Sequence, residues 1–343
     1  FALLYDPLQS DLPPAALAER VIESIAEPFG ALERGRLGTS IGIQFGTMAS
    51  ITQMLSCADD ALYSAKGAGR NSYRVFDANL QASREMRRDS GRDLSKALAE
   101  GRLAVWYQPI YGQDGTTLAG LEALVRWRHP QHGWIPPADI IAAAATAGLT
   151  ESLLRFILEQ ACSILGLLRD EGLAHVRVAM NVSPREMAQL PADAIVLKRL
   201  EELALPPSSL EIEITEETAL GIDVIQDKLS RLANAGVRVA LDDFGVGYAS
   251  LASLRQLHAG RIKIDRSLVT GLSCSRDKSV MVQAVLNLGI SLGLEVVAEG
   301  VETADDLSAL QELGCPFLQG YHLGRPMPLS DLIPMLSASR AAA

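Results

Sequence analysis

The chain is poor in cysteine and has no long apolar run. Its four cysteines stand apart, at positions 57, 162, 274 and 315, and none forms a CxxC pair, which argues against a zinc site or a disulfide framework. Buried, reduced thiols are therefore expected. The longest apolar candidate, IIAAAATAGL, is shorter than the roughly 18 residues that a membrane span needs, and no signal peptide is visible. These absences predict a cytoplasmic location, with no membrane contact by this segment.

The chain also lacks an excess of basic residues, because 31 Lys and Arg against 41 Asp and Glu give a net charge of −10. A nucleic-acid groove needs a basic stripe, so no DNA or RNA partner is expected. A small anionic ligand is compatible with this charge, since bound metal ions and a few basic residues reverse its sign locally. The sequence begins at Phe1 without a methionine, which predicts a fragment whose upstream part could hold a sensor or a membrane anchor.

Residues 1–76 predict part of an α/β domain, with too few elements for a comfortable core of their own. Residues 77–100 are charged and predict a connecting helix with a break near Ser90 and Gly91. In the first segment, the patterns predict strands at 1–6, 39–46 and 71–77 and helices at 14–29 and 50–69.

Residues 101–337 alternate strand and helix patterns, which is typical of a (β/α)8 barrel of the TIM type. The gap at 111–117 is too short for a crossover helix, so the first barrel strand is predicted antiparallel to the second and the others parallel. Seven apolar runs each finish on an acid, an amide or a lysine, and such strand ends meet at the C-terminal mouth of a barrel. These residues are Glu122, Asn181, Glu213, Asp242 with Asp243, Lys263, Glu299 and Gln319.

Side chains alternate across a strand, and the polar residues keep the same phase over six strands, so they are predicted to point into the barrel. Five of them are carboxylates, whose combined charge requires neutralisation by divalent metal. Oxygen ligands without His or Cys favour Mg²⁺ or Mn²⁺ over zinc. Asp242 and Asp243 are adjacent and cannot share a regular strand face, so Asp243 is expected to lie in the loop that follows.

Two metal ions commonly hold the attacking and leaving oxygens of a phosphoryl displacement. Lys263 could orient the attacking water, and Glu299 suits a general base. Arg126 could hold a substrate phosphate through two hydrogen bonds. The residues by themselves therefore indicate a metal-dependent enzyme that acts on a phosphoester.

Eight short stretches, each weak alone, are specific as a set. They are YQPI (107–110), EALVRW (122–127), NVS (181–183), EITE (213–216), DDFGVGY (242–248), KID (263–265), AEGVE (298–302) and QGY (319–321). Through them, the span from about 92 to 337 resembles the EAL-domain cyclic di-GMP phosphodiesterases. The resemblance implies hydrolysis of cyclic di-GMP to linear pGpG with two Mg²⁺ or Mn²⁺ ions, in a homodimer formed through the loop after Asp243.

The resemblance also implies roles for individual residues. Metal ligation is implied for Glu122, Asn181, Glu213, Asp242 and Asp243. Catalytic roles are implied for Glu299 and Lys263 in water activation and for Glu216 in holding the DDFG loop. Substrate contacts are implied for Arg126, Gln108, Asp265, Gln319 and Glu302.

The chain departs from the family pattern at Val246 and Ala249, which predicts weakened or conditional turnover, and at Ile140 and Ala145, near the expected guanine contacts. Two alternatives to the phosphodiesterase stay open: a cyclic di-GMP receptor without turnover, and an unrelated metal-dependent barrel enzyme. The complete set of catalytic residues favours an active enzyme.

Residues 1–76 carry SIGI (40–43) and ADDALYSAKGAGRNSYRVF (58–76), and they resemble the C-terminal half of a GGDEF, or diguanylate cyclase, domain. The signature acids of that family would lie upstream, so this segment is not expected to form a cyclase site.

Overall fold

The computed structural model describes residues 1–6, 12–26, 38–46, 50–67, 71–215, 222–245, 254 and 257–342. They form two compact units, Phe1–Ser90 and Gly91–Ala343, and each is described by itself. Across these ranges, no helix has both the length and the apolar character needed to cross a membrane. None of the four cysteines forms a disulfide in the described residues; Cys57, Cys162 and Cys315 are buried as predicted, whereas Cys274 is exposed.

The first unit places helices beside a small parallel sheet. Strands β1 (Ile41–Ile43) and β2 (Tyr73–Val75) pair in parallel, and helices α1 (Pro14–Ala26) and α2 (Ile51–Gly67) pack on them. One stripe of α2 is buried, because Cys57, Ala61 and Ala65 follow each other at four-residue spacing. The two helices and two of the three strands expected from the sequence are therefore present.

Two predictions for this part of the chain are wrong. Residues 1–6 form no strand, and in the described residues β1 and β2 pair only with each other. Helix α3 (Ala78–Ala99) also runs without a break through Ser90 and Gly91. A glycine inside a helix costs only about 1 kcal/mol, and the buried Leu94 and Ala97 anchor the turns that follow it.

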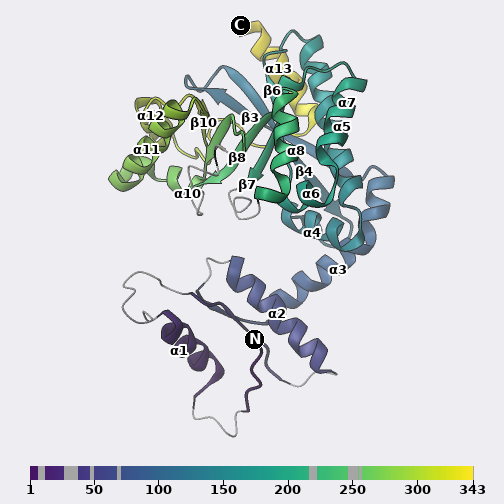
Figure 1. The fold of residues 1–343 in the computed structure, drawn as a ribbon, viewed down its shortest axis with the longest axis vertical. Coiled ribbons are helices and arrows are strands. Elements are labelled where there is room, and N and C mark those ends of the chain that lie inside the picture. The colour runs from purple at the N-terminus through teal and green to yellow at the C-terminus, as the bar shows by residue number, and fades with distance from the viewer. Residues whose placement is uncertain are drawn as a thin grey trace. The chain divides into compact units, whose positions relative to one another are not determined.

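The second unit is a closed barrel of eight strands, in the order β3-β11-β10-β9-β8-β7-β6-β4, which closes because β3 also pairs with β4 (Figure 1). Strand β3 is antiparallel to both neighbours, and all the other pairs in the ring are parallel, which confirms the predicted fold. The strands are β3 (Leu103–Gly112), β4 (Leu118–His129), β6 (Arg177–Asn181), β7 (Leu210–Thr215), β8 (Arg238–Phe244), β9 (Arg261–Ile264), β10 (Glu295–Ala298) and β11 (Phe317–Leu318).

Helices surround this ring (Figure 1). Contacts join α5 to β6, α8 to β8 and α11 to β10, and β5 (Gly133–Ile135) extends β4 as a hairpin. The helices are α4 (Pro137–Ala147), α5 (Thr150–Asp170), α6 (Pro184–Gln189), α7 (Ala192–Glu202), α8 (Ile222–Asn234), α10 (Arg266–Val269), α11 (Arg276–Leu292), α12 (Ala304–Glu312) and α13 (Leu329–Ala342).

The apolar residues of each barrel strand form the core. Ile212, Ile214, Val239 and Leu241 are at most 1% exposed, and each alternates with a more polar or smaller neighbour in its strand. Because alternate side chains of a strand point to opposite faces, the polar residues of these strands share the face that points into the barrel.

Gly320 lies where two chain segments meet. The backbone N–H of Val301 donates to the carbonyl of Gln319, and the N–H of His322 donates to that of Val301. A Cβ on residue 320 would lie 2.2 Å from the backbone N and O of Val301, which leaves no room for a methyl group.

Gly320→Ala is therefore expected to lower the free energy of unfolding by about 1–3 kcal/mol, because the two backbone segments have to separate. Urea unfolding measures this change. Gly166→Ala is the matched control: its Cβ would meet nothing within 4 Å, and it lies inside α5, where alanine is favoured over glycine by up to about 1 kcal/mol. Equal stability of Gly320→Ala and the unchanged protein would contradict the packing described.

Candidate active site

The predicted strand-end residues meet around one buried ammonium group. The Nζ of Lys263 lies 2.6 Å from Oε1 of Glu299 and 2.9 Å from Oε1 of Glu213. It also lies 3.4 Å from Oδ1 of Asp242 and 3.5 Å from Oε2 of Glu122. The Lys263 side chain is 1% exposed, so this cation is enclosed by acids from four other strands or strand ends.

Two amides fix the carboxylate of Glu122. Asn181 donates from Nδ2 to Oε1 over 2.9 Å, and Gln319 donates from Nε2 to Oε2 over 2.6 Å. The parallel register sets Asn181 opposite Glu213, and a backbone bond from Gln319 to Ala298 holds the segment after β11 against β10. We call the following residues the rim cluster: Glu122, Asn181, Glu213, Asp242, Asp243, Lys263, Glu299 and Gln319.

A β-bulge brings the two adjacent aspartates to the same site. Leu241 pairs with Ile262 and Phe244 pairs with Ile264, so two residues of β8 oppose one residue of β9. The prediction that Asp243 lies in the following loop is wrong, because β8 continues through Phe244.

Asp243 has a φ of 56°, in the left-handed region that few residues other than glycine adopt. Its backbone N–H donates to Oδ1 of Asp242 over 3.0 Å. Strained backbone of this kind is concentrated at functional sites, where the surrounding structure enforces it. Here it allows both carboxylates to approach Glu299, although a regular strand would point them to opposite faces.

Burial and the neighbouring negative charges raise the pKa values of several acids in the rim cluster. Burial, together with the charges of Asp242 and Asp265, raises the pKa of Asp243 to about 6. Burial and the neighbouring acids likewise raise the pKa of Glu299, even though Lys263 opposes the shift. Burial and Glu122 raise the pKa of Glu213 well above its usual value.

The pKa values of Glu122 and Lys263 are shifted in the directions that favour their charged forms. Burial acts to raise the pKa of Glu122, but the charge of Lys263 and the bonds from Gln319 and Asn181 lower it overall. Burial acts to lower the pKa of Lys263, but four surrounding carboxylates raise it well above its usual value. Glu122 is therefore held ionised and Lys263 is held charged, while the other acids carry the unbalanced repulsion.

The donor set of the rim cluster fits a hard divalent cation. Oε1 of Glu213 pairs with Lys263, but Oε2 of Glu213 and Oε1 of Gln319 are buried and accept no hydrogen bond from the described residues. Such acceptors are rare in folded proteins unless an ion or water satisfies them. Asp242, Asp243 and Glu299 offer oxygens within 4.8 Å of one another, and oxygen-only ligand sets suit Mg²⁺ or Mn²⁺.

Three other predicted site residues lie outside the rim cluster and make contacts of their own. Gln108 faces Glu122 across the β3–β4 pair and donates to the carbonyl of Gly324. Arg126 is half-buried and donates to the carbonyl of Val125. Asp265 caps α10, and its charge reaches Asp243.

Two predicted residues are not joined to the rim cluster. Glu302 is exposed, and no described contact connects it to that cluster. Glu216 lies outside the described residues, as do Val246 and Ala249.

Sequence reasoning missed the aromatic partners of the arginines. The guanidinium carbon of Arg126 lies 5.8 Å from the ring centre of Trp106, and that of Arg325 lies 4.6 Å from the ring of Tyr321. The sequence did carry a signal for them, because Trp106 lies two residues before Gln108 and Tyr321 lies two residues after Gln319.

The family model for the EAL domain matches residues 91–326, which is more than half of the chain and includes the whole barrel. The chain belongs to the EAL-domain family. Residues 1–90 lie outside this match, and they match no GGDEF family model.

Curated relatives extend the similarity beyond the EAL barrel. The bifunctional diguanylate cyclase/cyclic di-GMP phosphodiesterase MucR of Pseudomonas aeruginosa is 37% identical over 323 residues, covering 93% of this chain and 47% of MucR. The cyclic di-GMP phosphodiesterase NbdA of the same organism is 34% identical, over 99% of this chain and 44% of NbdA. The chain thus spans about half the length of the curated relatives it matches.

Solved EAL structures share the barrel. A MucR phosphodiesterase structure in complex with c-di-GMP superimposes with a TM-score of 0.67 at 39% identity, covering 71% of this chain and 99% of that one. The EAL domain of Mycobacterium smegmatis DcpA has a TM-score of 0.60 at 32% identity, covering 69% of this chain and 99% of that one.

Proposed function

We propose that the EAL barrel hydrolyses cyclic di-GMP to linear pGpG in a metal-dependent reaction of bacterial second-messenger signalling. The observation that carries this proposal is the gathering of five carboxylates, two amides and one lysine at the strand ends of an EAL barrel. The MucR structure, which contains c-di-GMP, supports the choice of substrate because it resembles this barrel at 39% identity.

The charge of the rim cluster supports two cations. Its five carboxylates and the single ammonium of Lys263 leave four negative charges when all acids are ionised, and two divalent ions would balance them. Glu122, Asn181, Glu213 and Asp242 would hold one ion, and Asp243 would serve the other. When bound, Mg²⁺ or Mn²⁺ would supply electrostatic stabilisation of the charge that develops on the phosphate oxygens.

The remaining residues would bind, orient and exchange a proton. Hydrolysis adds the hydroxyl of one water to phosphorus and transfers a proton to the leaving 3′ oxygen. Glu299 would accept the proton of the attacking water, since its raised pKa suits a general base near neutral pH. Lys263 would keep Glu299 in place through their 2.6 Å ion pair. Arg126 has a planar guanidinium suited to a substrate phosphate.

Further roles rest on the family pattern alone. Gln108, Asp265, Gln319 and Glu302 are proposed to contact substrate, and Glu216 is proposed to hold the DDFG loop. Gln319 donates one amide N–H to Glu122 and its buried oxygen accepts no hydrogen bond from the described residues, so a substrate contact would use its second N–H or this oxygen.

A turnover assay tests the proposed function. The purified chain is incubated with cyclic di-GMP in EDTA, Mg²⁺ or Mn²⁺, and the products are separated by chromatography. Linear pGpG that forms only with a divalent ion is the expected result. Binding of cyclic di-GMP without any pGpG under all three conditions would instead identify a receptor, and neither binding nor turnover would point to another phosphoester.

Metal affinity is expected to rise with pH, because protons compete with the cation for the same carboxylates. Asp243, with a pKa of about 6, is protonated below that pH, and Glu299 also has a raised pKa. Mn²⁺ titrations between about pH 5 and 8.5 should therefore show tighter binding at each step upward. Asp243→Asn should flatten the part of this dependence near pH 6, whereas a pH-independent affinity in the unchanged protein would exclude the assignment.

We also infer that residues 1–76 are the C-terminal part of a GGDEF-like domain, followed by a linker at 77–100 and the EAL domain at 101–337. Residues 1–90 make up about a quarter of the chain, so an alignment with bifunctional MucR that covers 93% of it includes most of them. The parallel pair β1–β2 with its two helices is compatible with an α/β domain of this kind.

A homodimer through the loop after Asp243 is part of the same proposal. Residues 246–253 of that loop lie outside the described residues. Mass measurement in solution, with activity followed at several protein concentrations, tests the dimer, and full activity of a strict monomer would refute it.

A further inference from the structure

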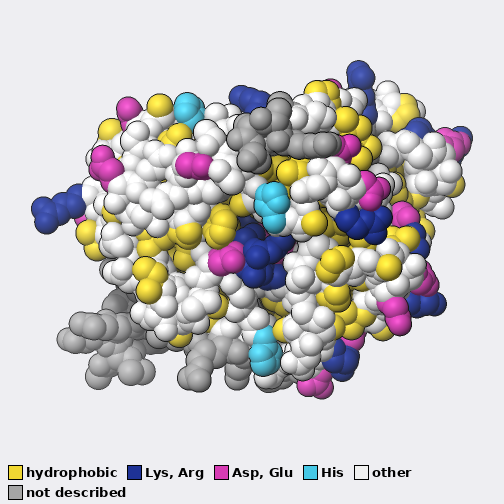
Figure 2. All heavy atoms as spheres, turned by 90° about the horizontal axis from the view of Figure 1, so that it is seen from above, with side chains coloured by type: hydrophobic (Ala, Val, Ile, Leu, Met, Phe, Trp, Pro, Cys, Tyr) yellow, Lys and Arg dark blue, Asp and Glu magenta, His cyan; other side chains and the backbone are white. Residues whose placement is uncertain are grey.

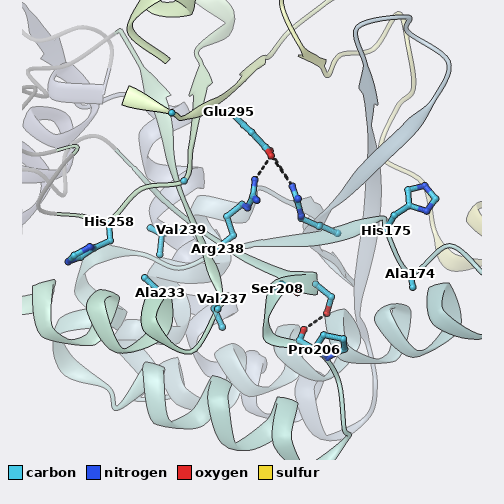
Figure 3. Close-up of a pocket in the computed structure, with 15 residues that line it drawn as sticks. Ala174, His175, Pro206, Ser208, Ala233, Val237, Arg238, Val239, His258 and Glu295 are labelled. Carbon is cyan, nitrogen blue, oxygen red and sulfur yellow. Dashed lines mark hydrogen bonds and ion pairs between the residues drawn. The ribbon is translucent and has the colours of Figure 1, made fainter. Parts of the chain in front are cut away.

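A cavity of about 570 Å³ opens at the N-terminal ends of the parallel barrel strands, the end opposite to the rim cluster. We call it the basal cavity. Arg177, Arg238 and Glu295 begin β6, β8 and β10 and line its wall, while His175 and His258 stand on opposite sides of it (Figure 3).

Three arginines converge on one carboxylate at this cavity. Glu295 lies 3.2 Å from Nη1 of Arg177, 2.5 Å from Nη1 of Arg238 and 2.6 Å from Nη2 of Arg261. Arg261 also pairs with the buried Glu211 over 2.9 Å. Three guanidinium groups against two carboxylates leave one positive charge in excess, in a protein whose net charge is −10.

Arg177 and Arg238, the two arginines that line the basal cavity, have N–H groups for which the described residues supply no acceptor. Arg177 and Arg238 each reach Glu295 through Nη1, and no other acceptor among the described residues contacts their remaining N–H groups. Their side chains are 28% and 26% exposed, whereas Arg261 is 2% exposed and bonded to both acids. Figure 2 shows basic side chains gathered in a hollow of the surface beside an acidic one.

A purely structural network would explain only part of this arrangement. The ion pairs join the starts of β6, β8, β9 and β10, and the N-terminal end of such a barrel usually contributes stability. Arg261 serves this role for β9, which it joins to β7 and β10, because it is buried and bonded to both Glu211 and Glu295. Arg177 and Arg238 instead face a cavity, and burial and the charges of Arg238 and Arg261 lower the pKa of Arg177, as expected for cations crowded without enough anions.

We propose that the basal cavity binds a small phosphorylated molecule whose phosphate lies between Arg177 and Arg238. A phosphate offers several acceptor oxygens to two planar guanidinium forks, and each fork can donate two parallel hydrogen bonds. The volume of the cavity is in the range of small-molecule sites, roughly 300–1,000 Å³, so the ligand can carry an organic group besides its phosphate.

Inorganic pyrophosphate is the probe for this site. It is titrated into the whole chain in EDTA, without divalent metal, at fixed ionic strength, and the arginine Nε–H signals are followed by NMR alongside calorimetry. Without metal the rim cluster is acidic and repels anions, so a single saturable site with shifted arginine signals is the expected result.

Arg238→Gln should weaken pyrophosphate binding by about tenfold or more, since a charged hydrogen bond is lost. Arg177→Gln gives an independent second variant, and in either one Glu295 keeps two arginine partners. Arg155→Gln is the matched control, because it removes the same charge from the exposed face of α5. Absence of binding, or equal affinity in Arg238→Gln and Arg155→Gln, would overturn the proposal and leave the network a structural one.

Discussion

Replacing Glu122 by alanine is expected to reduce metal-dependent hydrolysis of cyclic di-GMP by at least about 10²–10³-fold. Glu122 is held ionised by Lys263 and is clamped by Asn181 and Gln319, so its loss removes a proposed metal ligand and releases two amides at once. The measurement is the initial rate of pGpG formation at saturating Mn²⁺, together with the affinity for Mn²⁺.

Glu122→Gln separates ligation from packing, because it keeps the volume and one acceptor oxygen while removing the charge. It should lose turnover nearly as completely as Glu122→Ala but remain folded. Glu151→Gln, on the exposed first turn of α5, removes the same charge elsewhere and should leave turnover unchanged. An unchanged rate in both Glu122 variants would mean that the ligands are wrongly assigned.

Replacing Lys263 by methionine is expected to destabilise the metal-free protein by about 3–5 kcal/mol, since it leaves four buried or half-buried acids without their shared cation. Urea unfolding in EDTA measures this loss. Mg²⁺ should recover more stability in Lys263→Met than in the unchanged protein, because ligand binding to the folded state offsets the missing charge.

The loss of folding stability in Lys263→Met should also increase with pH. Lys263 lowers the pKa values of Glu213 and Glu299, so its removal raises them further. An acid whose pKa is raised in the folded state costs stability as the pH rises above its unfolded value. The deficit of Lys263→Met should therefore be larger at pH 8 than at pH 5. Lys198→Met, an exposed control on α7, should show no such trend. A deficit that shrinks with rising pH would contradict the electrostatic account.

The meeting of the strand-end residues was predictable because two regularities act together. Side chains alternate along a strand, and parallel strands of a closed barrel bring their C-terminal ends to one rim. The phase of Glu122, Glu213 and Lys263 in their strands was therefore enough to place them together. The loop at 111–117 similarly fixed the antiparallel direction of β3, because its length excludes a crossover helix.

Other features depend on tertiary context that no local pattern contains. The bulge at Asp242 and Asp243 arises from the register between β8 and β9, so alternation alone placed Asp243 in the wrong element. Residues 1–6 have a strand-like composition, yet they join neither strand of the small β1–β2 sheet. The ion pair between Glu211 and Arg261 did leave a signal in the sequence. Each lies two residues before a residue of the rim cluster, Glu213 or Lys263, and therefore on the same face of its strand, but only the structure shows that the two are paired.

Anomalous diffraction from crystals grown with Mn²⁺ tests the central claim most directly. Two peaks within ligating distance of the rim cluster, one beside Glu122, Asn181, Glu213 and Asp242 and the other beside Asp243, are the predicted result. Peaks that lie elsewhere on the barrel, or none at a Mn²⁺ concentration that supports pGpG formation, would contradict the account.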